Sequence, residues 1–382
     1  MTEDDESSLP GYFNLRQEYC VHVRHLLTLA AAVAASATSV STLEAQAPAA
    51  PPPAPQVTVS GVVYGQYQYD LKDSVGAAGV NLGKQNQFSI KRAYVNVIGR
   101  FAGGLQTRIT ADIAPSGTTN QIFRLKYAYA AWTPEGSSLT YKLGLLHTPW
   151  LDWEEALWDY RMQGTMATER GGYTTSADFG AGIDGKWNND QVNGQLTLVN
   201  GEGYSGGTGD KRKDVQLRLS VRVMNTDDAS RVGGLRLSGY AGIGKVTGGG
   251  DRNRFIGLAS YRSKQFTLAG EFASTKDTVS PVGADSLNLG GGPSATGRIL
   301  SAFGVVHLPD SKVSAIARVD VIDPNTSTSP NKLTRFIGGV SYQVNANLRM
   351  LADVDLLSFE ATPRNQTTAT RQQGLVQMQF TF

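Results

Sequence analysis

The 382-residue chain has little that would support redox or metal chemistry, because it holds one cysteine and four histidines. The cysteine, Cys20, stands near the amino terminus, so the rest of the chain has neither a disulfide framework nor a cysteine-based metal site. No group of residues recurs at the spacing of metal ligands. We accordingly expect no metal site and no cofactor.

The chain also lacks an apolar run of the ~20 residues that a membrane-spanning helix needs. Residues 26–37 form a shorter apolar run that follows a basic residue and precedes small residues, which is typical of a secretory signal. We assign residues 1–47 to a signal region whose start is misassigned before Val21, because acidic residues are unusual ahead of a signal. The alternative is a genuine amino-terminal extension. Residues 48–56 form a proline-rich linker.

Neither sign of charge dominates. The chain has 35 Lys and Arg against 33 Asp and Glu, for a formal net charge of +2. The basic residues are dispersed along the sequence rather than clustered, and this pattern does not indicate a nucleic-acid partner.

The abundant feature is strict alternation of apolar and polar residues from residue 57 onward. In residues 215–223, for example, apolar residues at odd positions alternate with Gln, Arg and Ser at even positions. Such stretches reach the length that a tilted strand needs to cross a bilayer. Sixteen stretches are predicted as strands: 57–71, 86–101, 104–115, 121–134, 138–147, 178–189, 191–201, 212–225, 233–246, 252–263, 265–276, 296–308, 311–324, 331–344, 346–359 and 371–382.

The connections between these strands alternate between short and long. Short turns on one side and long loops on the other are typical of outer-membrane barrels, and closure leaves no free strand edge in lipid. The fold predicted for residues 57–382 is therefore an all-β, transmembrane antiparallel β-barrel of 16 strands in the outer membrane. A soluble β-sandwich or β-helix is the alternative. The last strand ends in Phe382, which resembles the assembly signal of bacterial outer-membrane proteins.

Residues 148–177 interrupt the alternation. Trp150, Trp153 and Leu157 recur at helical spacing. An insertion of this length among tight turns is usually functional, and its aromatic content argues against disorder. We expect it to fold into the barrel as a constriction loop, with its aromatic residues on the wall and its carboxylates facing the pore. Its key residues are predicted to be Trp150, Asp152, Trp153, Glu154, Glu155, Trp158, Asp159 and Arg161.

Polar residues opposite the apolar face of each strand point into the lumen. The predicted pore-lining basic residues are Arg92, Arg100, Arg108, Arg124, Lys126, Lys142, Arg218 and Arg222. One hypothesis is that a basic wall opposes an acidic loop segment at the narrowest point and sets ion selectivity there. The alternative is that these charges only solvate the lumen.

Part of the chain resembles a known family. The residues that carry the resemblance lie between about 86 and 200: Phe88–Phe101, Leu105–Asp112, Tyr127–Trp132, Leu143–Trp150, Glu169-Arg170 and Asp178–Gly185. These stretches resemble the strands and the loop boundaries of phosphate-selective (O/P-type) outer-membrane porins of Gram-negative-type bacteria. The resemblance implies a sixteen-stranded barrel, usually a homotrimer, that passes small anions.

The function expected from the sequence is that of an outer-membrane porin, which would allow passive, charge- and size-selective diffusion of small hydrophilic solutes, chiefly phosphate or other anions. A barrel enzyme, or an adhesin that binds a partner through its loops, is the alternative. His147 and His307 are expected at opposite ends of the barrel, too far apart to act in one site. We therefore expect no catalytic residues and no enzyme activity.

Overall fold

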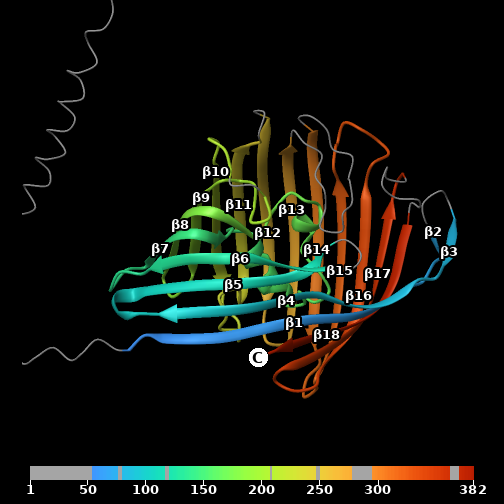
Figure 1. Cartoon of the computed structure of the whole chain (residues 1–382), viewed down its shortest axis with the longest axis horizontal. Helices are drawn as coiled ribbons and strands as arrows, with labels where there is room; N and C mark the ends of the chain where they lie inside the picture. The colour runs from blue at the N-terminus through green and yellow to red at the C-terminus, as the bar shows by residue number, and fades with distance from the viewer. Residues whose placement is uncertain are drawn as a thin grey trace, which may run out of the picture. The chain divides into compact units, whose positions relative to one another are not determined.

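The structure is a computed structural model that describes residues 54–75, 80–116, 120–206, 209–246, 250–277, 295–361 and 370–382. The predicted signal region and most of the linker lie outside these residues. Sixteen described strands close into one antiparallel barrel (Figure 1). In chain order they are β1 (Gln56–Asp70), β4 (Asn86–Arg100), β5 (Leu105–Ser116), β6 (Asn120–Trp132), β7 (Leu139–His147), β8 (Ala177–Trp187), β9 (Val192–Val199), β10 (Asp214–Met224), β11 (Gly234–Lys245), β12 (Asp251–Arg262), β13 (Phe266–Asp277), β14 (Ala295–His307), β15 (Val313–Asp323), β16 (Leu333–Gln343), β17 (Leu348–Phe359) and β18 (Thr370–Thr381).

The predicted fold is confirmed strand by strand, and the predicted bounds differ from the observed ones by at most two residues. Each strand pairs with its neighbour in sequence, apart from the pairing of β1 with β18 that closes the ring. The short strands β2 (Ser74–Val75) and β3 (Asn81–Gly83) form a separate two-stranded sheet in the first long connection.

The barrel is apolar outside and polar inside. Along β10, Leu217 and Leu219 are about half exposed, whereas Arg218 and Ser220 between them are buried. A soluble protein would bury the leucines. The reversed pattern fits a surface that lies in lipid around a polar interior.

The chain's last residue extends the pairing of β1 with β18 that closes the ring. Gly61 on β1 exchanges two backbone hydrogen bonds with Phe382, of 2.8 and 3.0 Å. A Cβ atom at Gly61 would lie 2.3 Å from the Phe382 ring, so only glycine leaves room for this ring. The terminal phenylalanine therefore packs at the seam of the barrel.

The longest connections leave one end of the barrel, whereas those at the other end span at most the nine residues 225–233. The turn from β8 to β9 spans residues 188–191, and Asn188, Asn189 and Asp190 adopt φ values of 52°, 51° and 64°. Asn and Asp tolerate this left-handed conformation better than most residues. Tight turns of this kind contrast with the 29-residue connection between β7 and β8.

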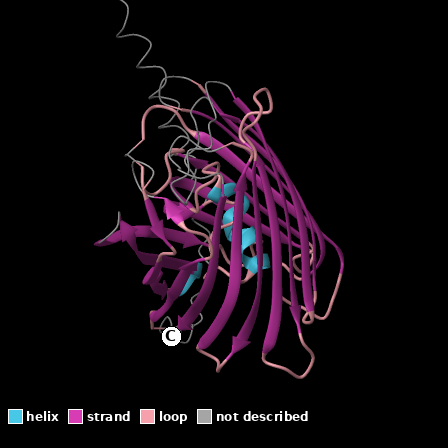
Figure 2. Cartoon of the chain, turned by 90° about the vertical axis from the view of Figure 1, so that its right-hand side faces the viewer, coloured by secondary structure: helices cyan, strands magenta, loops and turns pink. Residues whose placement is uncertain are grey.

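That connection, residues 148–176, lies inside the barrel and contains helices α2 (Leu151–Trp158) and α3 (Ala167–Arg170) (Figure 2). Helix α2 ends where Asp159 turns into the left-handed conformation, with φ 58°. Helix α2 packs against β13 and β14, and α3 packs against β14. We call residues 148–176 the inner loop. No helix in the described residues is long and apolar enough to span a membrane.

Candidate pore constriction

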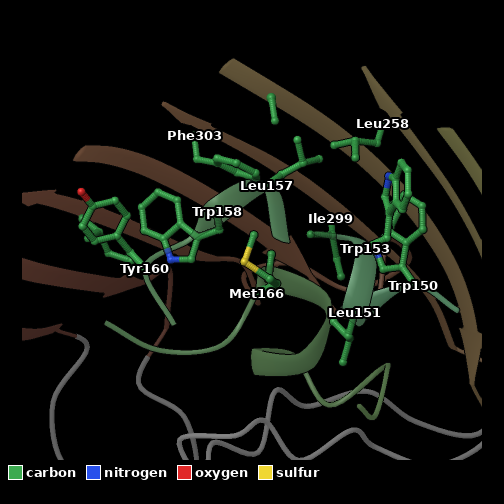
Figure 3. Close-up of a cluster of buried hydrophobic side chains, with 14 of the residues drawn as sticks. Trp150, Leu151, Trp153, Leu157, Trp158, Tyr160, Met166, Leu258, Ile299 and Phe303 are labelled. Atoms are coloured by element: carbon green, nitrogen blue, oxygen red, sulfur yellow. The ribbon is translucent and has the colours of Figure 1, made fainter. Parts of the chain in front are cut away.

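The aromatic side chains of the inner loop form the principal apolar core of the protein (Figure 3). Trp150, Trp153, Trp158 and Tyr160 are each at most 1% exposed. Trp158 packs edge-on against Phe303 of β14, with ring centroids 5.3 Å apart. The predicted packing of the loop on the wall is therefore correct, and it fixes the loop to one side of the lumen.

Polar tips of the same aromatic residues hydrogen-bond to the wall. The indole nitrogen of Trp150 donates to Glu271 at 3.1 Å, and that of Trp153 donates to Ser238 at 3.2 Å. The hydroxyl oxygens of Tyr160 and Ser341 are 2.7 Å apart. These bonds fix the rotation of each ring, because buried Tyr and Trp need a partner for their polar atoms.

Two of the predicted loop acids are paired with arginines of the barrel. Asp152 accepts a hydrogen bond of 2.7 Å from Arg231, in the turn between β10 and β11. Asp159 forms an ion pair of 3.3 Å with Arg349 of β17. Their charges are therefore compensated, and the loop is less acidic toward the pore than its sequence suggests.

The third acid, Glu154, contradicts the expectation that the loop carboxylates face the pore. Its side chain is fully buried between α2 and the wall, beside the carboxyl group of Glu271. Neither Glu154 oxygen has a hydrogen-bond donor among the described residues. Burial, together with the neighbouring Glu271, raises the pKa of Glu154 well above its ordinary value.

Glu155, the remaining predicted loop acid, is paired within the inner loop itself. Its carboxylate lies 2.7 Å from the guanidinium of Arg161, which belongs to the same loop. Burial disfavours the charged form of Arg161, but Tyr94 and Glu155 beside it raise its pKa further above the ordinary value. A second cation of the inner loop, Arg170, folds back over Gly164, where φ is 147° and a Cβ would lie 2.0 Å from its guanidinium.

Four of the predicted pore-lining cations and one carboxylate lie together on the inner wall of β4, β5 and β6, whereas a fifth, Arg100, lies at the end of β4. Asp112 forms ion pairs of 2.9 Å with both Arg92 and Arg124. Arg108 bonds to the neutral groups Asn96 and Thr110, and Lys126 bonds to the Tyr94 hydroxyl at 3.2 Å. Within the described part of the chain, neither Arg108 nor Lys126 has a carboxylate partner. Two of the three net positive charges of this group therefore belong to Arg108 and Lys126, and the third remains on the cluster of Arg92, Asp112 and Arg124.

The other predicted basic residues lie apart from this wall. Lys142 pairs with Asp184 and lies 3.0 Å from His147. Arg218 donates to Asn193 and stacks 4.2 Å from the ring centre of Trp153. The remaining two predicted residues are near the short-turn end: Arg222, which donates to the Asn189 backbone, and Arg100, which is exposed at the end of β4.

Tyrosines next to these cations were missed by the sequence reasoning. Lys126 lies 4.6 Å from the Tyr94 ring centre, and Arg108 lies 4.6 Å from that of Tyr127. Tyr204, in the loop after β9, donates to Asp112 at 3.2 Å. Strand alternation could have placed Tyr94 in the lumen, but Tyr127 and Lys126 are adjacent and both are buried, which a bulge between β5 and β6 allows.

Two cavities flank the inner loop. The first, about 390 Å³, is lined by Arg252 and Arg254, which pair with its own Asp214 and Asp277. The second, about 480 Å³, is lined by six basic residues and one carboxylate, Asp355. We call it the basic chamber. Its lining cations are Lys91, Arg92, Arg124, Arg161, Arg170 and Arg371.

No protein-family model matches the chain, and no curated protein sequence matches it. Solved structures show the same fold. An anion-selective porin from Comamonas acidovorans aligns with a TM-score of 0.61 at 12% identity, over 86% of this chain and 100% of that one. An in-vitro folded OmpT of Vibrio cholerae, in a trimer form, aligns with a TM-score of 0.59 at 11% identity, over 86% of this chain and 100% of that one. OmpF of Salmonella typhi in complex with daunomycin aligns with a TM-score of 0.60 at 15% identity, over 85% of this chain and 97% of that one.

These similarities show the barrel fold of outer-membrane porins. Together with the apolar outer surface, they bear out the predicted location in the outer membrane. The finer resemblance to phosphate-selective porins stays a prediction.

Proposed function

We propose that the protein is an outer-membrane porin, which passes small hydrophilic solutes by passive diffusion and prefers anions. The observation that carries this proposal is the inner loop, which is fastened to one side of the barrel interior and leaves the wall of β4, β5 and β6 opposite. That wall carries Arg92, Arg108, Arg124 and Lys126 against the single carboxylate Asp112.

The pairing of the loop acids supports the preference for anions. An acidic loop opposite a basic wall would favour neither ion. Asp152 and Asp159 are paired with arginines, and Glu154 is buried away from the lumen. Cationic side chains therefore outnumber available anionic ones beside the lumen, and such a lining attracts anions.

Export and assembly complete the proposal. Residues 1–47 act as a cleaved signal and residues 48–56 as a linker to the barrel. The protein assembles as a homotrimer, as the trimer form of the Vibrio protein suggests. Outward aromatic residues on β4 and β6, Phe88 at 84% exposure and Phe123 at 73%, are available to bury against a neighbouring copy. Phosphate and other small anions are the proposed solutes.

Single-channel recording in planar lipid bilayers tests the porin proposal. A diffusion porin gives long-lived, ohmic conductance steps after insertion of the purified protein. A barrel that inserts but conducts no ions would contradict the proposal and favour a loop-mediated binding function. Chemical cross-linking before and after boiling tests the trimer separately.

A further inference from the structure

The basic chamber combines cations with side-chain amides. Arg92 and Arg124 enter it from β4 and β6, and Arg161 enters it from the inner loop. Gln68 of β1 and Gln373 of β18 line it between these cations and Asp355. Its volume of about 480 Å³ lies within the range of pockets that hold small organic ligands.

The carboxylate partners of these arginines lie behind them. Asp112, which Arg92 and Arg124 share, is fully buried and does not line the chamber. Glu155, the partner of Arg161, does not line it either. An anion in the chamber would therefore meet guanidinium groups directly, and guanidinium binds carboxylates through paired, charge-assisted hydrogen bonds.

The amides offer a second kind of contact. Gln66 donates to Gln68 at 3.3 Å, and Gln68 donates to Asp70 at 3.4 Å. Both distances exceed the usual range for such bonds, so a ligand that replaces them loses little. Gln373 donates to Asp70 at a normal 3.1 Å, so a ligand hydroxyl competes with Asp70 for that amide. An amide both donates and accepts hydrogen bonds, as a hydroxyl group does, whereas halides and simple carboxylates only accept them.

We propose that the basic chamber is a binding site for hydroxylated organic anions, such as hexuronates. The carboxylate of the ligand binds the arginines, and its hydroxyl groups bind Gln68 and Gln373. The other chamber lacks this chemistry, because its arginines are paired with carboxylates in its own lining. This inference rests on the proposed porin function and adds a solute class to it.

Interruption of single-channel chloride current by added solutes tests the site. Three solutes of similar size separate its two components: glucuronate has both charge and hydroxyl groups, cyclohexanecarboxylate has only the charge, and glucose has only the hydroxyl groups. We expect glucuronate to bind roughly tenfold more tightly than either of the others, since each lacks one set of hydrogen bonds. Equal binding of glucuronate and cyclohexanecarboxylate would overturn the proposal.

Variants assign the two contacts. Arg161→Gln should weaken the binding of both carboxylate solutes, glucuronate and cyclohexanecarboxylate. The double variant Gln68→Leu/Gln373→Leu should lower the affinity for glucuronate by roughly three- to tenfold and leave the affinity for cyclohexanecarboxylate unchanged. Gln191→Leu, exposed on the β8–β9 turn, is the matched control and should change neither. If the double variant leaves glucuronate binding intact, the amide contacts are refuted.

The reversal potential of the same channels in potassium chloride separates two kinds of failure. If the channel prefers anions but binds glucuronate no better than cyclohexanecarboxylate, only the proposed binding site is overturned. Absence of anion preference overturns the proposed function, and the site with it.

Discussion

The charge that a solute meets in this lumen depends on which basic side chains have a carboxylate beside them. Asp112 lies directly opposite Arg124 in the pairing of β5 with β6, and it also binds Arg92 of β4. Arg108 and Lys126 have only neutral partners in the described structure. Removal of a paired arginine exposes a carboxylate as well, so the unpaired cations give the cleaner test of selectivity.

We predict that Arg108→Gln lowers the chloride-over-potassium permeability ratio. A positive unit charge ~7 Å from a passing ion lowers the energy of chloride and raises that of potassium by about 0.6 kcal/mol each in water. The ratio should therefore fall by up to roughly sevenfold, and by less where salt screens the charge. The reversal potential in a potassium chloride gradient measures this change. Lys312→Gln, exposed at the short turn after β14, removes the same charge away from the lumen and should leave the ratio unchanged. Equal ratios for wild type and Arg108→Gln would show that Arg108 does not contribute.

A second prediction concerns Glu154, whose raised pKa makes stability depend on pH. When the pKa of a carboxyl group is higher in the folded protein than in the unfolded chain, its protonation stabilises the fold. This contribution to stability is fully present at low pH. Its contribution is lost as the pH rises from the unfolded-state pKa, about 4.3, toward the folded one. We expect Glu154→Gln to raise the unfolding midpoint at alkaline pH and to flatten its pH dependence, as measured by urea unfolding between pH 5 and 9. Glu360→Gln, in an exposed loop, is the control. An unchanged pH profile in Glu154→Gln would contradict the raised pKa of Glu154.

Strand alternation placed basic residues such as Arg108 and Arg218 on the polar face of their strands, but it did not predict how they are paired. Pairing depends on strand register, and a bulge between Thr110 and Ala111 shifts the register of β5 against β6. The fate of Glu154 depends on where Glu271 lies, more than 100 residues later in the chain. A helical pattern distinguishes two faces of α2, yet it does not specify which carboxylate meets which wall.

The inner loop is the element that lies inside the barrel, and its tryptophans hold it in place. Trp158 packs between Tyr160 and Phe303, and its ring lies 5.7 Å from the Arg318 guanidinium. Arg318 in turn donates to the backbone of Thr165 at 3.0 Å. Apolar packing and polar contacts thus act on the same stretch of the loop.

We predict that Trp158→Ala loosens the loop without unfolding the barrel. Truncation of a buried Trp to Ala costs ~3–5 kcal/mol in well-packed sites, which is enough to allow frequent detachment. Single-channel records should show added conductance fluctuations. Trp132→Ala is the matched control, because Trp132 is half exposed at the end of β6 and does not contact the loop. Quiet records from Trp158→Ala would contradict the role of this residue as an anchor.

The position of the loop could be predicted from its length, its aromatic spacing and its place among the long connections. Which wall it packs on could not be predicted. The tryptophans need apolar or small positions on the inner face of the barrel, and β11 to β14 supply Ser238, Leu258, Ala273, Ile299 and Phe303. That inner apolar patch is hard to distinguish in sequence from the apolar residues that face lipid.

At the scale of the whole molecule, closure of the ring leaves no strand edge unpaired, as lipid requires. Strand count and bounds followed from the sequence because alternation, turn residues and the lengths of the connections all agree. The pairing of β1 with β18 followed only from the requirement for closure. Its register, with Gly61 beside Phe382, needed the structure.

We predict that Gly61→Ala destabilises the barrel, because its Cβ would meet the Phe382 ring and the Tyr94 carbonyl oxygen. Overpacking of this kind costs ~1–3 kcal/mol. Loss of the heat-resistant folded form on unboiled gels should occur at a lower temperature. Gly257→Ala is the matched control, since a Cβ there meets nothing within 4 Å. Equal midpoints for the two variants would argue against the Phe382 seam.

The central claim is that solutes pass a lumen in which cationic side chains outnumber available carboxylates. The reversal potential of the wild-type channel in a potassium chloride gradient tests this claim most directly. The account predicts a reversal potential with the sign expected when chloride is more permeant than potassium. The potential should be smaller when Arg108 and Lys126 are both replaced by Gln. A potential of zero, or one of the sign set by potassium, would contradict it.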